Sequence, residues 1–165
     1  MSKPTAVVVG VGAERGLGAA LCRRFAQGGY HVLVAGRTQA KIGRVAETIA
    51  AAGGSAEPIA MDATRESDVA GLFERAMAPG DGFDPTELVV SNAGNNQRID
   101  FRELTSEQFE DFWRVGCFSG FLVGQTWICA FCGSQSWLAH GGAEHGARIW
   151  ATRHPCSPCC DRRRH

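Results

Sequence analysis

The stretch TAVVVGVGAERGLG, residues 5–18, decides how the first half of the chain folds. Its first five residues are apolar or β-branched, a composition typical of a strand buried on both faces. Four glycines follow within nine residues, and apolar side chains then recur at helical spacing from Ala19 to Ala26. Gly28-Gly29 ends that pattern, as glycines end many helices. The stretch therefore predicts a strand, a glycine-rich turn and a helix, in that order.

The same alternation continues to about residue 125. Apolar runs predict further strands over 31–35, 56–61 and 87–90, with Pro58 interrupting the middle one. Helical spacing predicts helices over 38–52, capped by Thr38, and over 65–77. Thr105 and Gln108 have the spacing of a capping box, and Phe109, Phe112, Trp113 and Val115 then fall on one helical side. Strands separated by helices predict an α/β fold with a doubly wound, mostly parallel sheet.

The glycine-rich turn has the setting of a dinucleotide-binding site, because it joins a strand to a helix. Gly10 and Gly12 would permit the tight turn and let backbone N–H groups approach a pyrophosphate. Gly16 and Gly18, on either side of Leu17, would let the helix pack close to the sheet. The helix N-terminus would add partial positive charge near the phosphates. The alternative is a plain turn, since glycines punctuate many loops.

The end of the second strand indicates which dinucleotide binds. An NAD site usually carries Asp or Glu here to bind the ribose hydroxyls, whereas this chain has Ala-Gly-Arg-Thr at 35–38. Arg37, together with Arg15 of the turn, would hold a 2′-phosphate through charge-assisted hydrogen bonds. We therefore expect NADP in preference to NAD; the alternative is two solvated arginines.

Three segments resemble motifs of the short-chain dehydrogenase/reductase family. Residues 11–18 resemble its Thr-Gly-x-x-x-Gly-x-Gly turn, with Val11 in place of Thr, and residues 91–94 resemble its Asn-Asn-Ala-Gly motif, with Ser91 in place of the first Asn. Met61-Asp62-Ala63-Thr64 looks like the segment that binds the adenine amino group through Asp. The resemblance covers residues 5–125 and implies a Rossmann-like half-domain. It also implies that Asp62, Ala63, Asn92, Ala93 and Gly94 contribute to a nicotinamide dinucleotide site.

The resemblance further implies hydride transfer between NADP(H) and a carbonyl or alcohol carbon, with a Tyr and a nearby Lys managing the proton. Those residues are missing here: Tyr30 is the single Tyr, Lys3 and Lys41 are the two Lys, and no Tyr-x-x-x-Lys occurs. Aligning residues 113–116 with the family's fifth helix puts Gly116 at the proton-relay Asn. Ser119 then stands where that helix usually has Gly. We therefore assign no catalytic residue and expect no turnover. The alternative function is a non-catalytic nucleotide-binding regulatory module.

The composition divides the chain at about residue 125, into a half-domain over 1–125 and a divergent tail over 126–165. The tail holds five of the seven Cys and four of the five His. One interpretation is a zinc module built on the pairs Cys129/Cys132 and Cys156/Cys159, which would make the chain a zinc-bearing fusion. The favoured interpretation is an irregular tail that is no independent domain, because the composition is that of a GC-rich gene read out of frame.

Charge and hydropathy exclude several classes. Lys plus Arg and Asp plus Glu are 17 each, and zero net charge is unlike a nucleic-acid-binding surface. No apolar run is long enough to span a membrane, and the N-terminus does not resemble a signal peptide, so we expect a cytoplasmic, non-membrane protein. A sheet without the later strands of the family would be truncated and open to self-association at its free edge.

Overall fold

The computed structural model describes residues 2–78, 82–95 and 97–139, with the side chains of the last helix described as far as Ala130. Four parallel strands form one sheet in the order β3-β2-β1-β4. They are β1 (Lys3–Val9), β2 (His31–Gly36), β3 (Ser55–Ala60) and β4 (Phe83–Ser91). The helices are α1 (Leu17–Gln27), α2 (Gln39–Ala51), α3 (Glu66–Met77), α4 (Ser106–Trp113) and α5 (Ser119–Ala139), with a π-helical turn, η1 (Arg114–Phe118), between the last two.

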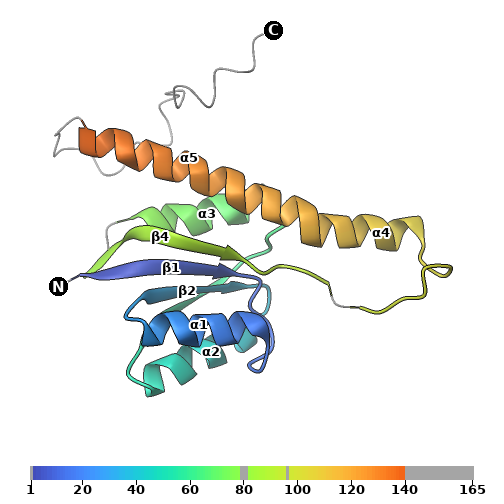
Figure 1. The fold of residues 1–165 in the computed structure, drawn as a ribbon, viewed down its shortest axis with the longest axis horizontal. Helices are drawn as coiled ribbons and strands as arrows, with labels where there is room; N and C mark the ends of the chain where they lie inside the picture. The colour runs from blue at the N-terminus through green and yellow to red at the C-terminus, as the bar shows by residue number, and fades with distance from the viewer. Residues whose placement is uncertain (1, 79–81, 96, 140–165) are drawn as a thin grey trace, which may run out of the picture.

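The helices cover both faces of the sheet, as Figure 1 shows. Every strand arrow points the same way, with α1 and α2 on one face and α3 and α5 on the other. This arrangement confirms the predicted doubly wound α/β fold.

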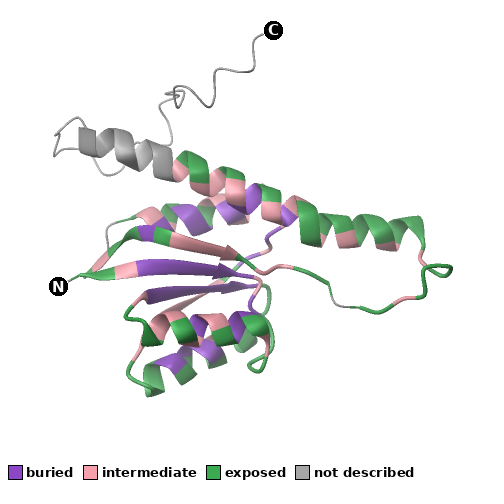
Figure 2. Ribbon diagram, in the orientation of Figure 1, coloured by how far each residue is buried: buried purple, intermediate pink, exposed green. Residues whose placement is uncertain are grey.

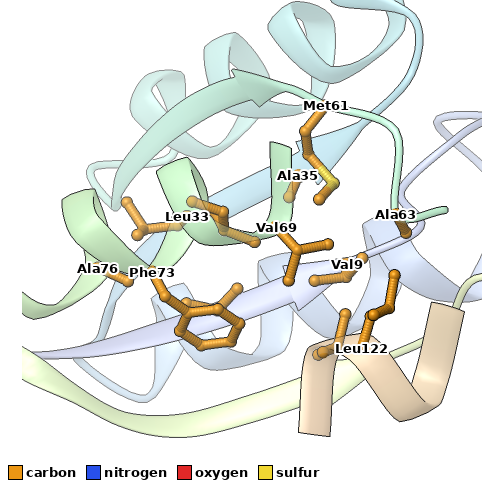
Figure 3. Packing of buried hydrophobic residues seen from close by; sticks show 12 residues of the cluster. Val9, Leu33, Ala35, Met61, Ala63, Val69, Phe73, Ala76 and Leu122 are labelled. Carbon is orange, nitrogen blue, oxygen red and sulfur yellow. The ribbon is translucent and has the colours of Figure 1, made fainter. Parts of the chain in front are cut away.

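Alternating side chains of the strands supply two separate cores. Val8, Val32 and Val34 lie in the core with α1 and α2, whereas Val7 and Leu33 lie in the core with α3 and α5. Figure 3 shows the second core, in which Phe73 and Val69 of α3 and Leu122 of α5 gather on the strand residues. All of β2 is buried, which fits the continuous apolar run predicted for a parallel strand.

Pro58 does not interrupt β3, contrary to the prediction. It pairs with Val34 inside a continuous strand, because β3 is the edge of the sheet and a missing N–H is tolerated there. β4 is also longer than predicted, since it begins at Phe83 and its register shifts twice opposite Lys3–Ala6. Because of these irregularities, the first residues of β4 show no regular pattern of buried and exposed side chains that would reveal where the strand begins.

Two features of the C-terminal part differ from the sequence pattern. Helix α5 passes through the predicted boundary at residue 125 and continues to Ala139, and Trp127 and Ala130 pack against the core. The predicted apolar side of α4 does not enter a core among the described residues: Phe109 and Trp113 are exposed. The rest of the predicted tail, residues 140–165, lies outside the described residues. No helix in the described part of the chain is long and apolar enough to cross a membrane.

Candidate functional site

A cleft of about 200 Å³ opens at the carboxyl ends of the four strands. In doubly wound sheets this edge, where the connections leave toward opposite faces, is where ligands bind. The turns after β1, β2 and β3, the segment after β4, and the junction of η1 and α5 surround it. The lining residues are Gly10, Val11, Gly12, Gly36, Arg37, Thr38, Lys41, Met61, Asp62, Ala63, Thr64, Ala93, Gly94, Val115 and Ser119.

Gly10 fixes the glycine-rich turn against the segment after β4. Its φ of 86° is one that glycine adopts readily, and a Cβ there would collide with the backbone of Ala93. The N–H groups of Gly10 and Val11 both donate to the carbonyl of Ala35, at 3.0 and 2.9 Å. The Gly10 N–H is therefore already paired within the protein. Its role is the close approach of two backbones.

The rest of the turn leaves room for a ligand. At Gly12 an added Cβ would meet nothing within 4 Å, so the turn is open toward the cleft at this position. Gly16 closes the turn by donating its N–H to Ala13 O at 2.8 Å, and it precedes α1 without a side-chain cap. The first N–H groups of α1, from Leu17 onward, are those that a helix leaves without an internal partner. Gly18 lets α1 pack closely, because its Cβ would stand 3.2 Å from Val11 Cα.

A basic group lies at the end of β2. Arg37, Thr38 and Lys41 line the cleft where α2 begins, and Thr38 is the N-cap at the predicted position. Its hydroxyl makes no capping hydrogen bond within the helix, so it is left for other partners. Arg15, expected beside Arg37, is exposed and is not among the residues that line the cleft. Lys41, in the first turn of α2, is the second cation that lines the cleft, and sequence reasoning did not single it out.

Asp62 is held in its charged form beyond the end of β3. The N–H and hydroxyl of Thr64 donate to its Oδ1 at 2.9 and 2.8 Å. These bonds from Thr64, aided by the charge of Arg37, hold the pKa of Asp62 below its usual value. The backbone N–H of Asp62 donates in turn to Asp68 Oδ2 at 2.9 Å. A fixed carboxylate of this kind suits an amino-group donor such as adenine.

Asn92, Ala93 and Gly94 join β4 to the cleft. The N–H of Asn92 continues the ladder by donating to Val9 O at 2.8 Å, and its Nδ2 donates to Gly10 O at 3.3 Å. Asn92 therefore ties the glycine-rich turn to β4 and does not itself line the cleft. A Cβ at Gly94 would meet nothing within 4 Å, which leaves open space there as at Gly12.

The far wall of the cleft comes from Val115 and Ser119, which lie four residues apart across the η1–α5 junction. Ser119 is buried and donates its hydroxyl to Val115 O. Gly116, aligned with the family's relay Asn, is exposed and not part of the wall. Tyr30 lies before β2, at the opposite end of the strand from the cleft, and the Glu87 carboxylate raises the pKa of its hydroxyl. A higher pKa is the wrong direction for proton transfer near neutral pH.

The predicted zinc ligands fall almost entirely outside the described residues. Cys129 is exposed on α5, whereas the side chain of Cys132 and residues 140–165 are not described. Within the described part, no three His, Cys, Asp or Glu side chains gather as a metal site would require.

Comparison with known proteins gives a consistent result. The family model described as short chain dehydrogenase matches residues 5–136. An uncharacterized oxidoreductase of Mycobacterium tuberculosis is 41% identical over 146 residues, which are 88% of this chain and 52% of that protein. The chain thus spans about half the length of this relative.

Solved structures agree with the sequence comparison. A metagenomic short-chain oxidoreductase in complex with NADP has a TM-score of 0.69 and 26% identity, covering 82% of this chain and 59% of its own. A short-chain type dehydrogenase/reductase from Mycobacterium marinum has a TM-score of 0.70 and 28% identity, covering 81% of this chain and 52% of its own.

Proposed function

Because the chain belongs to the short-chain dehydrogenase family of oxidoreductases, we propose that its cleft binds NADP(H) in preference to NAD(H). The observation that carries this proposal is the pair of cations, Arg37 and Lys41, at the end of β2, where an NAD site usually has a carboxylate. Guanidinium and ammonium groups both bind phosphate through charge-assisted hydrogen bonds. The NADP complex of the metagenomic relative is consistent with this choice.

The described residues fit the other parts of the dinucleotide. The open positions at Gly12 and Gly94 would admit the pyrophosphate and the nicotinamide half, and the N-terminus of α1 would supply N–H donors. Asp62 would accept from the adenine amino group through the oxygen that Thr64 leaves unbound. When bound, the nicotinamide would supply or accept the hydride of the family reaction.

We further propose that the 165-residue chain does not complete this reaction. Reduction of a carbonyl places negative charge on oxygen, which a positioned acid must neutralise. Tyr30 is remote from the cleft, and Lys41 is itself one of the two residues proposed to bind the 2′-phosphate. The cleft wall formed by Val115 and Ser119 offers one hydroxyl, which already donates within its own helix. The family reaction on a carbonyl or alcohol therefore needs groups that the described residues, 2–78, 82–95 and 97–139, do not bring to the cleft.

Titration calorimetry with NADPH and NADH tests the cofactor proposal. Loss of one charge-assisted contact costs about 1.5–3 kcal/mol, so Arg37→Asp should weaken NADPH binding at least tenfold and reverse the preference. Arg44→Asp is the matched control, because Arg44 is exposed on α2 away from the cleft. Equal affinities that Arg37→Asp leaves unchanged would refute the cofactor choice.

Absorbance at 340 nm tests the catalytic proposal. We expect no NADPH oxidation with a panel of aldehydes and ketones, even at concentrations where calorimetry shows NADPH bound. Turnover that disappears in a Gly12→Val variant would show that a catalytic group lies elsewhere in the chain. Binding without turnover is also what a regulatory nucleotide-binding module would give.

A further inference from the structure

Ser119 makes hydrogen bonds that differ from those of a residue in a regular α-helix. In an α-helix its N–H would donate to the carbonyl four residues back, which is Val115 O. Here the Ser119 N–H donates instead to Arg114 O, five residues back, and closes η1. The Ser119 hydroxyl donates to Val115 O in place of the N–H. One residue therefore supplies donors to both carbonyls, and neither is left without a partner by the π-helical turn.

This exchange of donors requires a hydroxyl at residue 119. With Ala or Gly there, Val115 O would lack this donor for as long as η1 persists. A return to α-helical bonding would give Val115 O the N–H of residue 119 instead. Ser119 is buried, so its hydroxyl has lost its contact with water and relies on this bond. Because a hydrogen bond contributes at most about tenfold to an equilibrium constant, loss of the hydroxyl should shift the balance between η1 and a regular helix by up to that factor.

The π-helical turn sets the orientation of the residues before it relative to α5. The start of α5 is fixed, because Leu122 and Val123 are buried in the core and a Cβ at Gly120 would stand 3.9 Å from Ser91 Oγ at the end of β4. α4 has no buried residue, and Figure 2 shows the change from exposed positions in α4 to buried positions in α5. A π-helical turn takes in one more residue than an α-helical turn, and one residue corresponds to about 100° of rotation. Straightening of η1 would therefore leave α5 in place and rotate the residues before it, Val115 among them.

We propose that Ser119 is a positioning residue: its hydroxyl holds η1, and η1 holds Val115 against the nicotinamide half of a bound dinucleotide. This inference rests on the proposed cofactor site. Val115 and Ser119 line the cleft on the side of β4, since the start of α5 lies beside the end of that strand. Arg37 and Asp62, proposed for the adenosine half, follow β2 and β3, which lie on the other side of β1. A dinucleotide with its adenosine end at β2 and β3 would therefore reach η1 with its other end.

A purely structural role for Ser119 makes a different prediction. Loss of a structural hydrogen bond would weaken the folded chain and lower the affinity for every ligand of the cleft alike. Loss of a positioning hydrogen bond would affect only the part of the ligand that reaches Val115. Adenosine 2′,5′-bisphosphate carries the adenine, the ribose and the 2′-phosphate but no nicotinamide. A comparison of this compound with NADPH therefore separates the two roles.

Titration calorimetry with NADPH and adenosine 2′,5′-bisphosphate tests the positioning role. We expect Ser119→Ala to weaken NADPH binding about three- to tenfold and to change binding of the bisphosphate by less than about twofold. Val115→Ala should give the same difference between the ligands, because it removes the side chain from the wall. Ser106→Ala is the matched control, since Ser106 is exposed in α4, and it should leave both affinities unchanged. Equal losses for the two ligands in Ser119→Ala, or no loss for either, would overturn the positioning role.

Nuclear magnetic resonance tests the hydrogen bonds without a ligand, because scalar coupling across a hydrogen bond identifies the carbonyl that accepts from a given N–H. We expect the Ser119 N–H to couple to the carbonyl carbon of Arg114 in the parent protein and in Val115→Ala. In Ser119→Ala the N–H of residue 119 should couple to that of Val115. Coupling to Val115 in the parent protein, or to Arg114 in Ser119→Ala, would overturn the proposal. If the parent protein binds neither ligand, the cofactor proposal fails, and the resonance result alone decides whether Ser119 holds η1.

Discussion

Two glycines of the same turn should respond in opposite ways to the same substitution. Gly10→Ala places a Cβ against the backbone of Ala93 in a residue whose φ is 86°, whereas Gly12→Ala adds a methyl group to open space. The left-handed conformation costs an L-residue roughly 1–2 kcal/mol, and overpacking typically adds about 1–3 kcal/mol. We therefore expect Gly10→Ala to lower the free energy of unfolding by about 2–5 kcal/mol. Gly12→Ala should change it by less than about 0.5 kcal/mol.

The assay is urea unfolding followed by circular dichroism at 222 nm, with NADPH titration of each variant that folds. Gly12→Ala should fold normally but bind NADPH more weakly, because its methyl group occupies space proposed for the ligand. Two results would refute this reasoning. One is a Gly10→Ala protein as stable as the parent, which would mean that the turn is not held against Ala93. The other is equal loss of stability in both variants.

Three further outcomes follow from individual side chains. Burial lowers the pKa of His31, so the unfolded chain binds more protons than the folded chain below about pH 6.5. The free energy of unfolding should therefore fall as the pH drops through that value. The urea midpoint of a His31→Gln variant should depend less on pH than that of the parent protein. Thr105→Ala removes a capping box and should cost α4 about 1 kcal/mol, seen as faster amide exchange in α4 with an unchanged global midpoint. Burial raises the pKa of the Cys22 thiol to about 12. Ellman's reagent should therefore modify the exposed Cys117 and Cys129 in the folded protein, and Cys22 only after unfolding. Labelling of Cys22 in the folded protein would contradict the packing of α1.

The sheet could be predicted because its signals are local. The run from Thr5 to Val9 and its counterparts need no partner to be recognised, since a strand buried on both faces is apolar throughout. The capping box at Thr105 and Gln108 could also be predicted from local spacing alone. Both of its hydrogen bonds are present, at 3.0 and 3.2 Å. The predicted interruption at Pro58 was wrong because the sequence pattern of a strand does not show whether the strand lies in the centre or at the edge of the sheet.

The sequence could predict a residue of the candidate site only where that residue belongs to a recognisable motif. Arg37 and Asp62 line the cleft as expected, whereas Arg15 does not, because the turn carries it out into solvent. Val115 and Ser119 line the cleft because the helical segment of η1 and α5 passes beside it. A long connection separates this segment from β4, and no local sequence pattern indicates where the segment lies. Helical periodicity also could not show that the apolar side of α4 stays outside the described core, whereas Leu122 and Val123 of α5 enter it.

The Ala35 carbonyl, which accepts from both Gly10 and Val11, makes the cleft a preorganised receptor. Two hydrogen bonds to a fully buried strand hold the glycine-rich turn in place before any ligand arrives, and Asn92 secures it from the other side. The conformational entropy of the turn is thus lost when the chain folds and not when a dinucleotide binds. Because Arg37 follows Ala35 by two residues, the same hydrogen bonds also set the spacing between the two parts of the cleft that we propose bind phosphate. The turn and the basic group at the end of β2 are therefore held at a fixed distance from each other, and this distance would select ligands of matching length.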